Sequence, residues 1–398
     1  MPQALRGMNM LNRAVWVEIN LDNLAHNISE VRRVTRKDAK VTAVIKADGY
    51  GHGAVHIAKT LLENGADRLA VATLTEALQL RKSYSDTEIL ILGYTEETSV
   101  HLAVENDLIQ TIYTIEQAKA FSEIAKSLNK NLKVHIKLDT GMTRLGMMPE
   151  IETIEAIEKI IKCDNLIVEG MYTHFARADE VDKTTTQKQV ENFEFVRKGL
   201  EEKDIRLDIY HVSNSASIID LPEYNFDMVR AGIMLYGLYP SDEVNKTDVK
   251  LKEVMSLHTK ISRVQEVESN VGVSYGHKYI TDDVRKVGTL PIGYADGFSR
   301  SLTFKAEAII KGKEKKVPVI GRICMDQCMI DVTGVDVSIG DEIILFGKDG
   351  QQEITIDDIA NHLGTINYEV VCMINRRVPR VYTSSGKVVK VVDYILSL

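Results

Sequence analysis

Cysteine, tryptophan and long apolar runs are scarce in this sequence of 398 residues, which holds four cysteines and one tryptophan. So few cysteines do not form the disulfide framework of a secreted protein, and they are typical of a reducing compartment, so we expect a cytoplasmic protein. No apolar run approaches the roughly 18 residues of a membrane span, which predicts no membrane partner. No long basic block occurs, which argues against a nucleic-acid partner.

A zinc-binding pattern and a secretion signal are also missing. Cys324 and Cys328 lie four residues apart without a second pair nearby, so we expect buried small side chains and no metal site. The segment Met1 to Arg13 lacks the apolar stretch of a signal peptide. Translation from Met8 or Met10 is an alternative that the sequence leaves open.

What is present is a regular alternation of strand-like and helix-like segments over the first 245 residues. With 44% hydrophobic residues, the chain is long enough for two domains with separate cores. Alternating strands and helices predict a parallel sheet, and eight such units predict a closed (β/α)8 barrel. An open doubly wound sheet is disfavoured because no glycine-rich dinucleotide fingerprint follows an early strand. The eight expected strands are 41–46, 68–73, 88–93, 109–114, 132–139, 166–174, 206–213 and 227–232.

Residues 246–398 have a different pattern, with two-residue alternation and turn signals in place of long helices. We therefore predict a barrel domain over 1–245 and a mostly β domain over 246–398. An alternating strand at 15–21 precedes the barrel strands and is a candidate to pair with the β domain. Asp22 is the expected cap of the helix that follows. The β domain is expected to contain one short helix, Ile356 to Leu363, and strands at 260–264, 287–292, 306–310, 317–320, 329–332 and 342–346.

Lys46 follows the apolar run 41–45 and precedes a glycine-rich stretch, Asp48 to Gly53. Burial disfavours an ammonium, so a lysine at the end of a buried strand is easily made neutral. A neutral amine is what a lysine needs in order to trap a carbonyl group. The alternative is a lysine whose chain reaches back to water. From this segment alone the two interpretations are equally good.

Polar side chains gather where the other expected strands end, and barrel enzymes carry their reactive groups at this end of the strands. Ser213 and Ser215 follow the seventh strand, and Gly232 and Ile233 follow the eighth. Hydroxyls and exposed amides at a helix start favour an anion, although Ser-Asn-Ser is also an ordinary helix cap. A phosphate site facing a carbonyl-trapping lysine suggests pyridoxal phosphate.

The chain resembles the alanine racemase family, fold-type-III pyridoxal-phosphate enzymes, over essentially its whole length. Each shared motif alone is weak, but so many in one order are specific. The matching segments are Val44 to Gly53, Lys137 to Met142 with Arg144 to Gly146, Tyr172 to Ala176, Asn214 to Ala216, Val229 to Ile233, Ser274 to Gly276, Pro291 to Gly297, Gly321 to Gln327 and Tyr368-Glu369.

The resemblance implies a two-base racemase. Lys46 holds the cofactor and acts as one base, and Tyr275 from the partner subunit acts as the other on the opposite face. His174 matches the histidine that lowers the pKa of that tyrosine. Arg230 donates to the pyridine nitrogen, which stays unprotonated because a guanidinium keeps its proton. His211 braces Arg230.

The resemblance also implies the remaining contacts of cofactor and substrate. The cofactor's phosphate and its surroundings are expected to involve Tyr50, Asn214, Ser215, Gly232, Ile233 and Tyr368. Arg144 and the backbone amide of Met325, again from the partner, are expected to bind the substrate carboxylate. Lys137 matches a lysine that many members carry as a carbamate, and Tyr294 and Asp296 match an entry channel. The implied protein is a cytoplasmic homodimer with composite sites that supplies D-alanine for peptidoglycan.

Three rivals remain beside L- and D-alanine interconversion. A serine racemase or a broad-specificity racemase fits the same scaffold, since one hydroxyl or methylene changes discrimination by only about 1–3 kcal/mol. A decarboxylase is disfavoured by Arg230, where an acidic residue is expected. A cofactor carrier without turnover is disfavoured by Ser274-Tyr275-Gly276.

Departures from the family pattern are Asp48 and Gly49, where Asn-Ala is common, and Thr143, where glycine is frequent.

Overall fold

The computed structural model describes residues 12–396, so the alternative starts Met8 and Met10 lie outside the described residues. The chain forms two compact units. The barrel unit comprises 24–49 and 54–252, and the β unit comprises 12–23, 50–53 and 253–396. No helix in the described part of the chain is long and apolar enough to cross a membrane.

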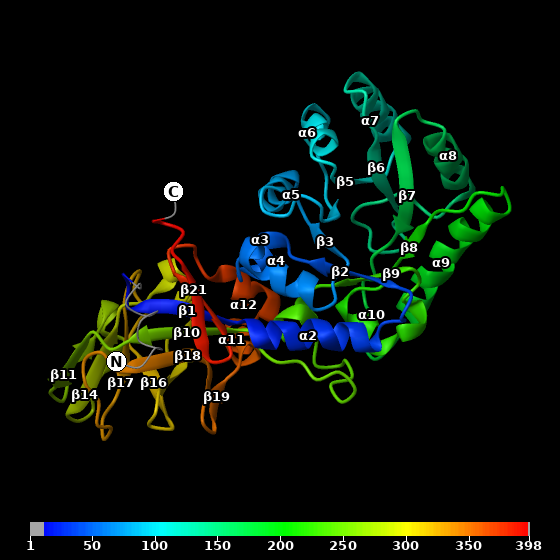
Figure 1. Ribbon diagram of the computed structural model, residues 1–398. Helices are drawn as coiled ribbons and strands as arrows, with labels where there is room; N and C mark the ends of the chain where they lie inside the picture. Colours follow the sequence, from blue (N-terminus) through cyan, green and yellow to red (C-terminus); the bar gives the residue numbers. More distant parts are fainter. Residues whose placement is uncertain (1–11, 397–398) are drawn as a thin grey trace. The chain divides into compact units, whose positions relative to one another are not determined.

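The barrel unit contains eight parallel strands in the order β8-β7-β6-β5-β4-β3-β2-β9, with its helices outside them (Figure 1). This confirms the predicted fold class. Each strand is a short apolar run whose residues are almost all buried, as expected for a parallel sheet covered by helices. The strands are β2 (Lys40–Val44), β3 (Arg68–Val71), β4 (Ile89–Ile91), β5 (Ile109–Ile112), β6 (Leu132–Lys137), β7 (Leu166–Tyr172), β8 (Ile209–His211) and β9 (Met228–Ala231).

The barrel is nearly closed, because among the described residues no regular strand ladder joins β8 to β9. Single backbone hydrogen bonds cross this seam instead. The amide of Asp227 donates to the carbonyl of Tyr210 at 3.0 Å, and the amide of Arg230 donates to the carbonyl of Ser213 at 3.0 Å. The side chain of Asp227 also accepts from the amide of Tyr210 at 2.8 Å.

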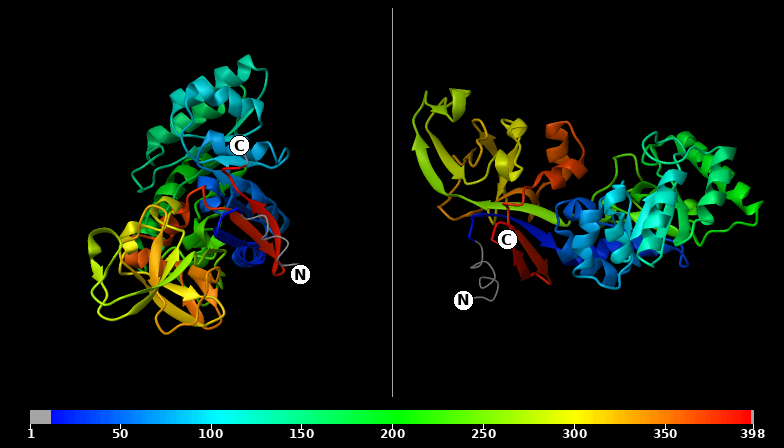
Figure 2. Two further views of the ribbon diagram at one scale, coloured as in Figure 1. Left: turned by 90° about the vertical axis from the view of Figure 1, so that its left-hand side faces the viewer. Right: turned by 90° about the horizontal axis from the view of Figure 1, so that it is seen from above.

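The helices of the barrel unit alternate with its strands along the chain, and Figure 2 shows them from two further sides. The first of them corrects a prediction: Asn20, not Asp22, accepts the hydrogen bond of the helix start, from the amide of Asn23 at 3.0 Å, and Asp22 lies inside the first turn. The helices are α2 (Leu21–Val34), α4 (Ala54–Glu63), α5 (Leu74–Arg81), α6 (Val100–Glu105), α7 (Ile115–Ser127), α8 (Ile151–Ile161), α9 (Thr184–Glu201), α10 (Ser215–Asp220), and the 3₁₀ turns η1 (Glu97–Ser99), η2 (Pro222–Tyr224) and η3 (Ile233–Tyr236).

The β unit is built on a large mixed sheet in the order β11-β14-β17-β16-β15-β18-β10-β1-β20-β21. Its first strand, β1 (Val15–Asn20), pairs antiparallel with β10 and parallel with β20. The other strands are β10 (Met255–Lys260), β11 (Arg263–Val267), β12 (Gly272–Val273), β13 (Tyr279–Ile280), β14 (Arg285–Leu290), β15 (Glu307–Ile310), β16 (Lys315–Ile320), β17 (Cys328–Asp331), β18 (Glu342–Asp349), β19 (Gln352–Ile354), β20 (Arg380–Ser384) and β21 (Lys387–Val392).

Two predictions for this unit were wrong. The expected strand 260–264 spans the end of β10 and the start of β11, which are separated at Ile261 and Ser262. The predicted helix α11 (Ile356–Leu363) is present, but a second one, α12 (Asn367–Met373), follows it after Gly364. Short 3₁₀ turns complete the unit, namely η4 (Tyr275–His277), η5 (Tyr294–Asp296) and η6 (Arg300–Leu302).

Candidate active site

Lys46 begins a left-handed turn, labelled α3 (Lys46–Tyr50), two residues beyond the end of β2. Ala47, Asp48 and Tyr50 have φ angles of 52°, 53° and 51°. A left-handed conformation costs an ordinary residue about 1–2 kcal/mol, so this backbone is strained. Gly49, with φ 63°, suits the turn, because a Cβ there would lie 2.7 Å from Cδ1 of Ile57.

The carboxylate of Glu76 connects the strained turn to the backbone just beyond β3. One oxygen accepts from the amide of Ala47 at 2.6 Å. The other accepts from the amides of Ala72 at 2.9 Å and Thr73 at 3.1 Å, just beyond β3. Glu76 therefore fixes the backbone beside Lys46 against the end of the adjacent strand.

Arg230 lies on β9 with its side chain buried, 4% exposed, and donates to carbonyls of two other strand ends. Nη2 donates to the carbonyls of Thr173 at 2.8 Å and Val212 at 3.1 Å, and Nη1 donates to the carbonyl of His211 at 3.2 Å. Two imidazoles also accept from it: Nδ1 of His211 at 2.9 Å and Nδ1 of His174 at 3.3 Å. The predicted bracing of Arg230 by His211 is thus a direct contact.

Burial and crowded positive charge keep the neighbouring bases neutral. The pKa of His174 lies well below its ordinary value because of burial and then the charges of Arg230 and Arg144. Burial, followed by the charge of Arg230, lowers the pKa of Lys137 to about 7. Its Nζ donates to the carbonyl of Leu138 at 2.5 Å and lies 5.5 Å from the ring centroid of Tyr172. Lys137 is therefore an amine that is readily uncharged near neutral pH.

Arg144 lies in a loop that is organised by Asp139. The carboxylate of Asp139 accepts from the amides of Gly141 at 3.1 Å, Thr143 at 2.9 Å and Arg144 at 2.7 Å. Burial raises the pKa of Asp139, but these hydrogen bonds outweigh it and the pKa is lowered. Thr143 has a φ of 56°, which is rare for a β-branched residue and explains why glycine suits this position.

The residues predicted to surround a phosphate come together at the starts of α10 and η3. Oγ of Ser215 accepts from the amide of Gly232 at 3.0 Å. Asn214 caps α10 by accepting from the amide of Ser217 at 3.2 Å. Ile233 begins η3, and the first amides of a helical turn have no partner within the turn. The structure therefore joins Asn214, Ser215, Gly232 and Ile233 into one polar corner.

In the β unit the predicted residues form two groups. The rings of Tyr50 and Tyr368 lie 6.2 Å apart between centroids. Three loops carrying Tyr275, Tyr294 and Met325 are tied together by hydrogen bonds, from Ser274 Oγ to the carbonyl of Arg322 at 2.6 Å and from the amide of Tyr294 to the carbonyl of Cys324 at 3.0 Å. Tyr275 is 67% exposed and Met325 is 52% exposed.

Asp296 differs from the other predicted residues because its carboxylate is fully buried in an ion-pair cluster. It contacts Arg13 at 2.6 Å and Arg377 at 2.7 Å, and it accepts from the amide of Gly293 at 3.1 Å. Through these contacts Asp296 anchors the turn that carries Tyr294.

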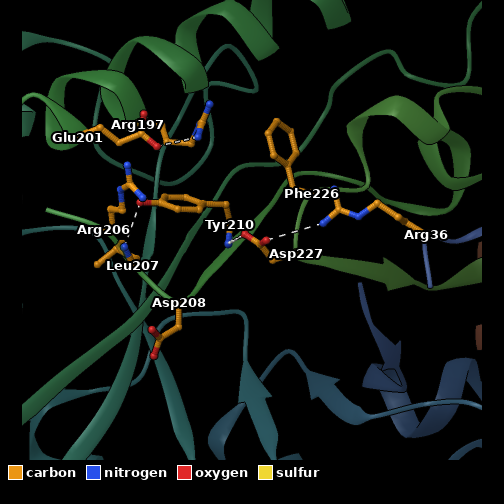
Figure 3. A pocket seen from close by; sticks show the side chains of 9 residues that line it. All are labelled: Arg36, Arg197, Glu201, Arg206, Leu207, Asp208, Tyr210, Phe226 and Asp227. Atoms are coloured by element: carbon orange, nitrogen blue, oxygen red, sulfur yellow. Dashed lines mark hydrogen bonds and ion pairs between the residues drawn. The ribbon is translucent and has the colours of Figure 1, made fainter. Parts of the chain in front are cut away.

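A separate surface pocket lies near the starts of β8 and β9, at the opposite strand ends from Lys137 and Arg230 (Figure 3). Its three arginines are balanced by three acidic side chains, and Arg197 contacts Glu201 at 2.9 Å. The pocket therefore offers no net charge to a ligand. It is lined by Arg36, Arg197, Glu201, Arg206, Leu207, Asp208, Tyr210, Phe226 and Asp227.

Comparison with known proteins identifies the family. The family model described as "Alanine racemase, N-terminal domain" matches residues 19–240. The model described as "Alanine racemase, C-terminal domain" matches residues 254–382. The chain belongs to the alanine racemase family. Its members are isomerases that depend on pyridoxal phosphate.

Individual relatives agree over nearly the full chain. The alanine racemase of Methanococcus maripaludis is 50% identical over 374 residues, covering 94% of this chain and 100% of that protein. The structure of an alanine racemase from Clostridium difficile has a TM-score of 0.93 at 45% identity, covering 97% of this chain and 100% of that one. A histidine racemase from Leuconostoc mesenteroides has a TM-score of 0.87 at 28% identity, covering 94% of this chain and 98% of that one.

The donor set of this chain fits the family's cofactor. Among the described residues no hydrogen bond is made by Nε of Arg230, although both Nη atoms are engaged, so one donor is left for a ring nitrogen. The hydroxyl of Ser215 and the amide of Ile233 supply donors suited to a phosphate. Pyridoxal phosphate, when bound, supplies an electron sink for the charge left by removal of an α-proton.

Sequence reasoning missed the polar residues that support these groups from inside the barrel. His135 and Glu169 are buried within β6 and β7 and belong to the hydrogen-bond system of His211. For Glu169 the available signal was a single charged residue inside the otherwise apolar strand β7, whereas β6 carries two lysines beside His135. Glu76 was missed because a glutamate three residues after Thr73 is also an ordinary capping box.

We predict that Glu76→Ala lowers the free energy of unfolding by at least about 2 kcal/mol, because three amides lose a charged acceptor. Urea unfolding followed by circular dichroism measures the change. Glu123→Ala, an exposed position on α7, is the matched control and is expected to stay within about 0.5 kcal/mol of the unchanged protein. Equal stabilities of the two variants would show that Glu76 does not hold the turn.

Proposed function

We propose that this chain interconverts L-alanine and D-alanine with pyridoxal phosphate as cofactor. The observation that carries the proposal is Arg230, a buried guanidinium with one uncommitted donor at the strand ends of a barrel from this family. An arginine at the ring nitrogen keeps that nitrogen unprotonated, which separates a racemase from enzymes that place a carboxylate there. The decarboxylase alternative is accordingly not favoured. The carrier alternative is disfavoured by Ser274-Tyr275-Gly276 in the β unit.

Substrate choice is supported by the relatives, not by the fold. Related barrels are named for both alanine and histidine, so the architecture admits different side chains. The relatives at 45–50% identity over nearly the whole chain carry the name alanine racemase. Alanine is therefore the proposed substrate, and a broad-specificity or serine racemase is not favoured.

The proposed chemistry uses two bases on opposite faces of the α-carbon. Lys46 removes or returns the proton on one face, and Tyr275 of the partner subunit does so on the other. His174 supports Tyr275 as a neutral imidazole: its Nδ1 accepts from Arg230, so its proton is on Nε2, where it is available as a donor to a phenolate.

A homodimer with composite sites is part of the proposal. Tyr275 and Met325 are large side chains that stay mostly exposed on the β unit, and the loops bearing them are linked by hydrogen bonds. Exposed apolar and aromatic side chains that gather on tied loops suit an interface. In the dimer, Arg144 and the amide of Met325 from the partner subunit would hold the substrate carboxylate.

A carbamate on Lys137 completes the proposed site. The neutral amine attacks carbon dioxide, forming an N–C bond and releasing one proton to solvent, so that a neutral group becomes an anion. The low pKa of Lys137 provides the neutral amine. The resulting anion would offset the charges of Arg144 and Arg230, which otherwise repel the ammonium.

The proposed setting is the cytoplasm, with D-alanine supplied for peptidoglycan. All four cysteines are free in the structure, as expected in a reducing compartment. Tyr50, Asn214, Ser215, the amides of Gly232 and Ile233, and Tyr368 are the proposed surroundings of the cofactor phosphate. Tyr294 and Asp296 are proposed to shape substrate entry.

The decisive experiment is a chiral assay of the purified protein with pyridoxal phosphate and separate L-amino acids. We expect reversible formation of D-alanine well above that of D-serine. Comparable rates for several amino acids would indicate broad specificity, and no D-isomer would contradict the proposal.

Lys46→Ala is expected to lose the visible absorbance of the bound cofactor, and an unchanged spectrum would remove Lys46 as its anchor.

Tyr275→Phe is expected to retain the cofactor but lose about a hundredfold to ten-thousandfold of turnover in both directions, since one proton-transfer group is missing. Initial rates from each isomer measure the loss. Tyr94→Phe, which alters an exposed tyrosine of the barrel unit, is the matched control and should keep normal rates. Near-normal racemisation by the Tyr275 variant would refute the two-base scheme.

Carbamate formation on Lys137 is expected above about pH 7, where the neutral amine predominates. Exposure to ¹³C-labelled carbon dioxide should give a protein carbamate signal in ¹³C NMR, and Lys137→Ala should lack that signal. Lys133, on the same strand, is the matched control and is expected to form no carbamate. Its hydrogen bond to Glu88 raises its pKa, which keeps the amine charged. A signal that survives in the Lys137 variant would contradict this assignment.

A further inference from the structure

A line of buried polar side chains leads from Arg230 through the interior of the barrel unit. Nη1 of Arg230 lies 2.9 Å from Nδ1 of His211. Nε2 of His211 lies 2.8 Å from Nδ1 of His135, on β6. Nε2 of His135 lies 2.7 Å from Oε2 of Glu169, on β7. Each of the four side chains belongs to a residue that is less than one-tenth exposed.

The far end of this line is held ionised by Arg68. Nη1 of Arg68, which is fully buried, donates to Oε2 of Glu169 at 2.9 Å. Lys133 lies 3.5 Å from the other oxygen of Glu169, and Arg68 also bonds Glu88. Burial raises the pKa of Glu169, but the hydrogen bond from His135 and the charge of Arg68 outweigh it and lower the pKa.

The two ends fix the direction of every hydrogen bond between them. A guanidinium only donates, so Nδ1 of His211 accepts and the proton of that ring is on Nε2. Nδ1 of His135 must then accept from His211, and its own proton is on Nε2, where the carboxylate of Glu169 accepts it. Both imidazoles are thus neutral, in agreement with their lowered pKa values, which burial causes first.

The backbone is shaped to admit the His135 ring. The register between β6 and β7 shifts between Val134 and His135. Opposite the ring stands Gly170, where a Cβ would lie 2.9 Å from Cε1 of His135 and 2.6 Å from the carbonyl oxygen of Ile209. A shift in strand register and a glycine at one point are features that re-aim a side chain.

Arg230 lacks a direct counter-ion. Within residues 12–396 no carboxylate forms a hydrogen bond or ion pair with it, and burial lowers its pKa to about 10. A buried charge without compensation is costly and becomes a stronger acid. Glu169 is the carboxylate that the hydrogen-bonded line connects to it.

We propose that His135 and Glu169 are positioning residues that act through His211 as a remote counter-ion for Arg230. The negative charge of Glu169 polarises the two imidazoles, which makes Nδ1 of His211 a stronger acceptor and keeps the proton on the guanidinium. The inference rests on the proposed role of Arg230 at the cofactor's ring nitrogen. It adds that a residue inside the barrel, without contact to the cofactor, sets the protonation of that nitrogen.

The test is ¹⁵N NMR of the holoenzyme, with labelled histidine and with cofactor labelled at the ring nitrogen. In the unchanged protein both imidazoles should be neutral with their protons on Nε2, and the ring nitrogen should be unprotonated. Glu169→Gln keeps an acceptor for His135 but removes the charge. It should raise the protonated fraction of the ring nitrogen at least about tenfold, since one pKa unit is a factor of ten.

Two further variants separate the relay from general electrostatics and from misfolding. Glu88→Gln is the matched control, because it removes a charge from the same Arg68 cluster without touching His135, and it should leave the ring-nitrogen signal unchanged. His135→Leu keeps the pair of Arg68 and Glu169 but interrupts the line, so it should reproduce the effect of Glu169→Gln.

The outcomes are distinguishable. The proposal would be overturned if Glu88→Gln raised the protonated fraction of the ring nitrogen as much as Glu169→Gln does. It would also be overturned if Glu169→Gln or His135→Leu left that fraction unchanged. Imidazole protons on Nδ1 in the unchanged protein would contradict the relay alone. A ring nitrogen already protonated there, with the imidazole pattern intact, would instead contradict the role proposed for Arg230 and with it this inference.

Discussion

The buried guanidinium of Arg230 is the interaction on which the candidate site depends. It reaches from β9 to the carbonyls of Thr173, His211 and Val212, at the ends of β7 and β8. Because β8 and β9 share no ladder within the described chain, these side-chain bonds help to close the weakest seam of the barrel. Removing the guanidinium would leave buried acceptors unpaired, which costs more than the bonds themselves contribute. The side chain of Arg230 thus has two roles. Its Nη atoms help to close the barrel, and its Nε remains available as a donor to the cofactor.

The same charge sets the protonation of its surroundings. It lowers the pKa of His174 and of Lys137, in each case after burial, so His174 is a neutral imidazole and Lys137, which would otherwise be charged near neutral pH, becomes a reactive amine. Two neutral bases beside fixed cations form a site suited to anionic groups, such as a phosphate and a carboxylate. The proposed remote counter-ion explains how the cation at the centre keeps its proton despite burial.

The fold was predictable, and so was the position of several candidate residues at the strand ends, because these signals are local. Apolar runs alternating with amphipathic segments predict the barrel, and Lys46, Lys137, His174 and Arg230 lie at or just beyond strand ends. His135 and Glu169 were not predictable in their roles, because their partners come from other strands and meet only when the barrel closes. The left-handed turn after Lys46 was missed because alanine and aspartate seldom adopt it, and the tertiary hydrogen bonds to Glu76 override their local preference.

Glu76 and Asp139 show the same device used twice. Each carboxylate accepts three backbone amides and thereby holds a strained, left-handed segment, one beginning at Lys46 and the other preceding Arg144. Only an acceptor without protons can take three amide donors at once, so a glutamine or asparagine would not serve equally. Both carboxylates accept from backbone amides and do not bond the cationic side chains of Lys46 and Arg144, so they stiffen the two turns without engaging those cations. Thr143 is tolerated in place of glycine for the same reason: the hydrogen bond from its amide to Asp139 offsets the strain of its φ angle.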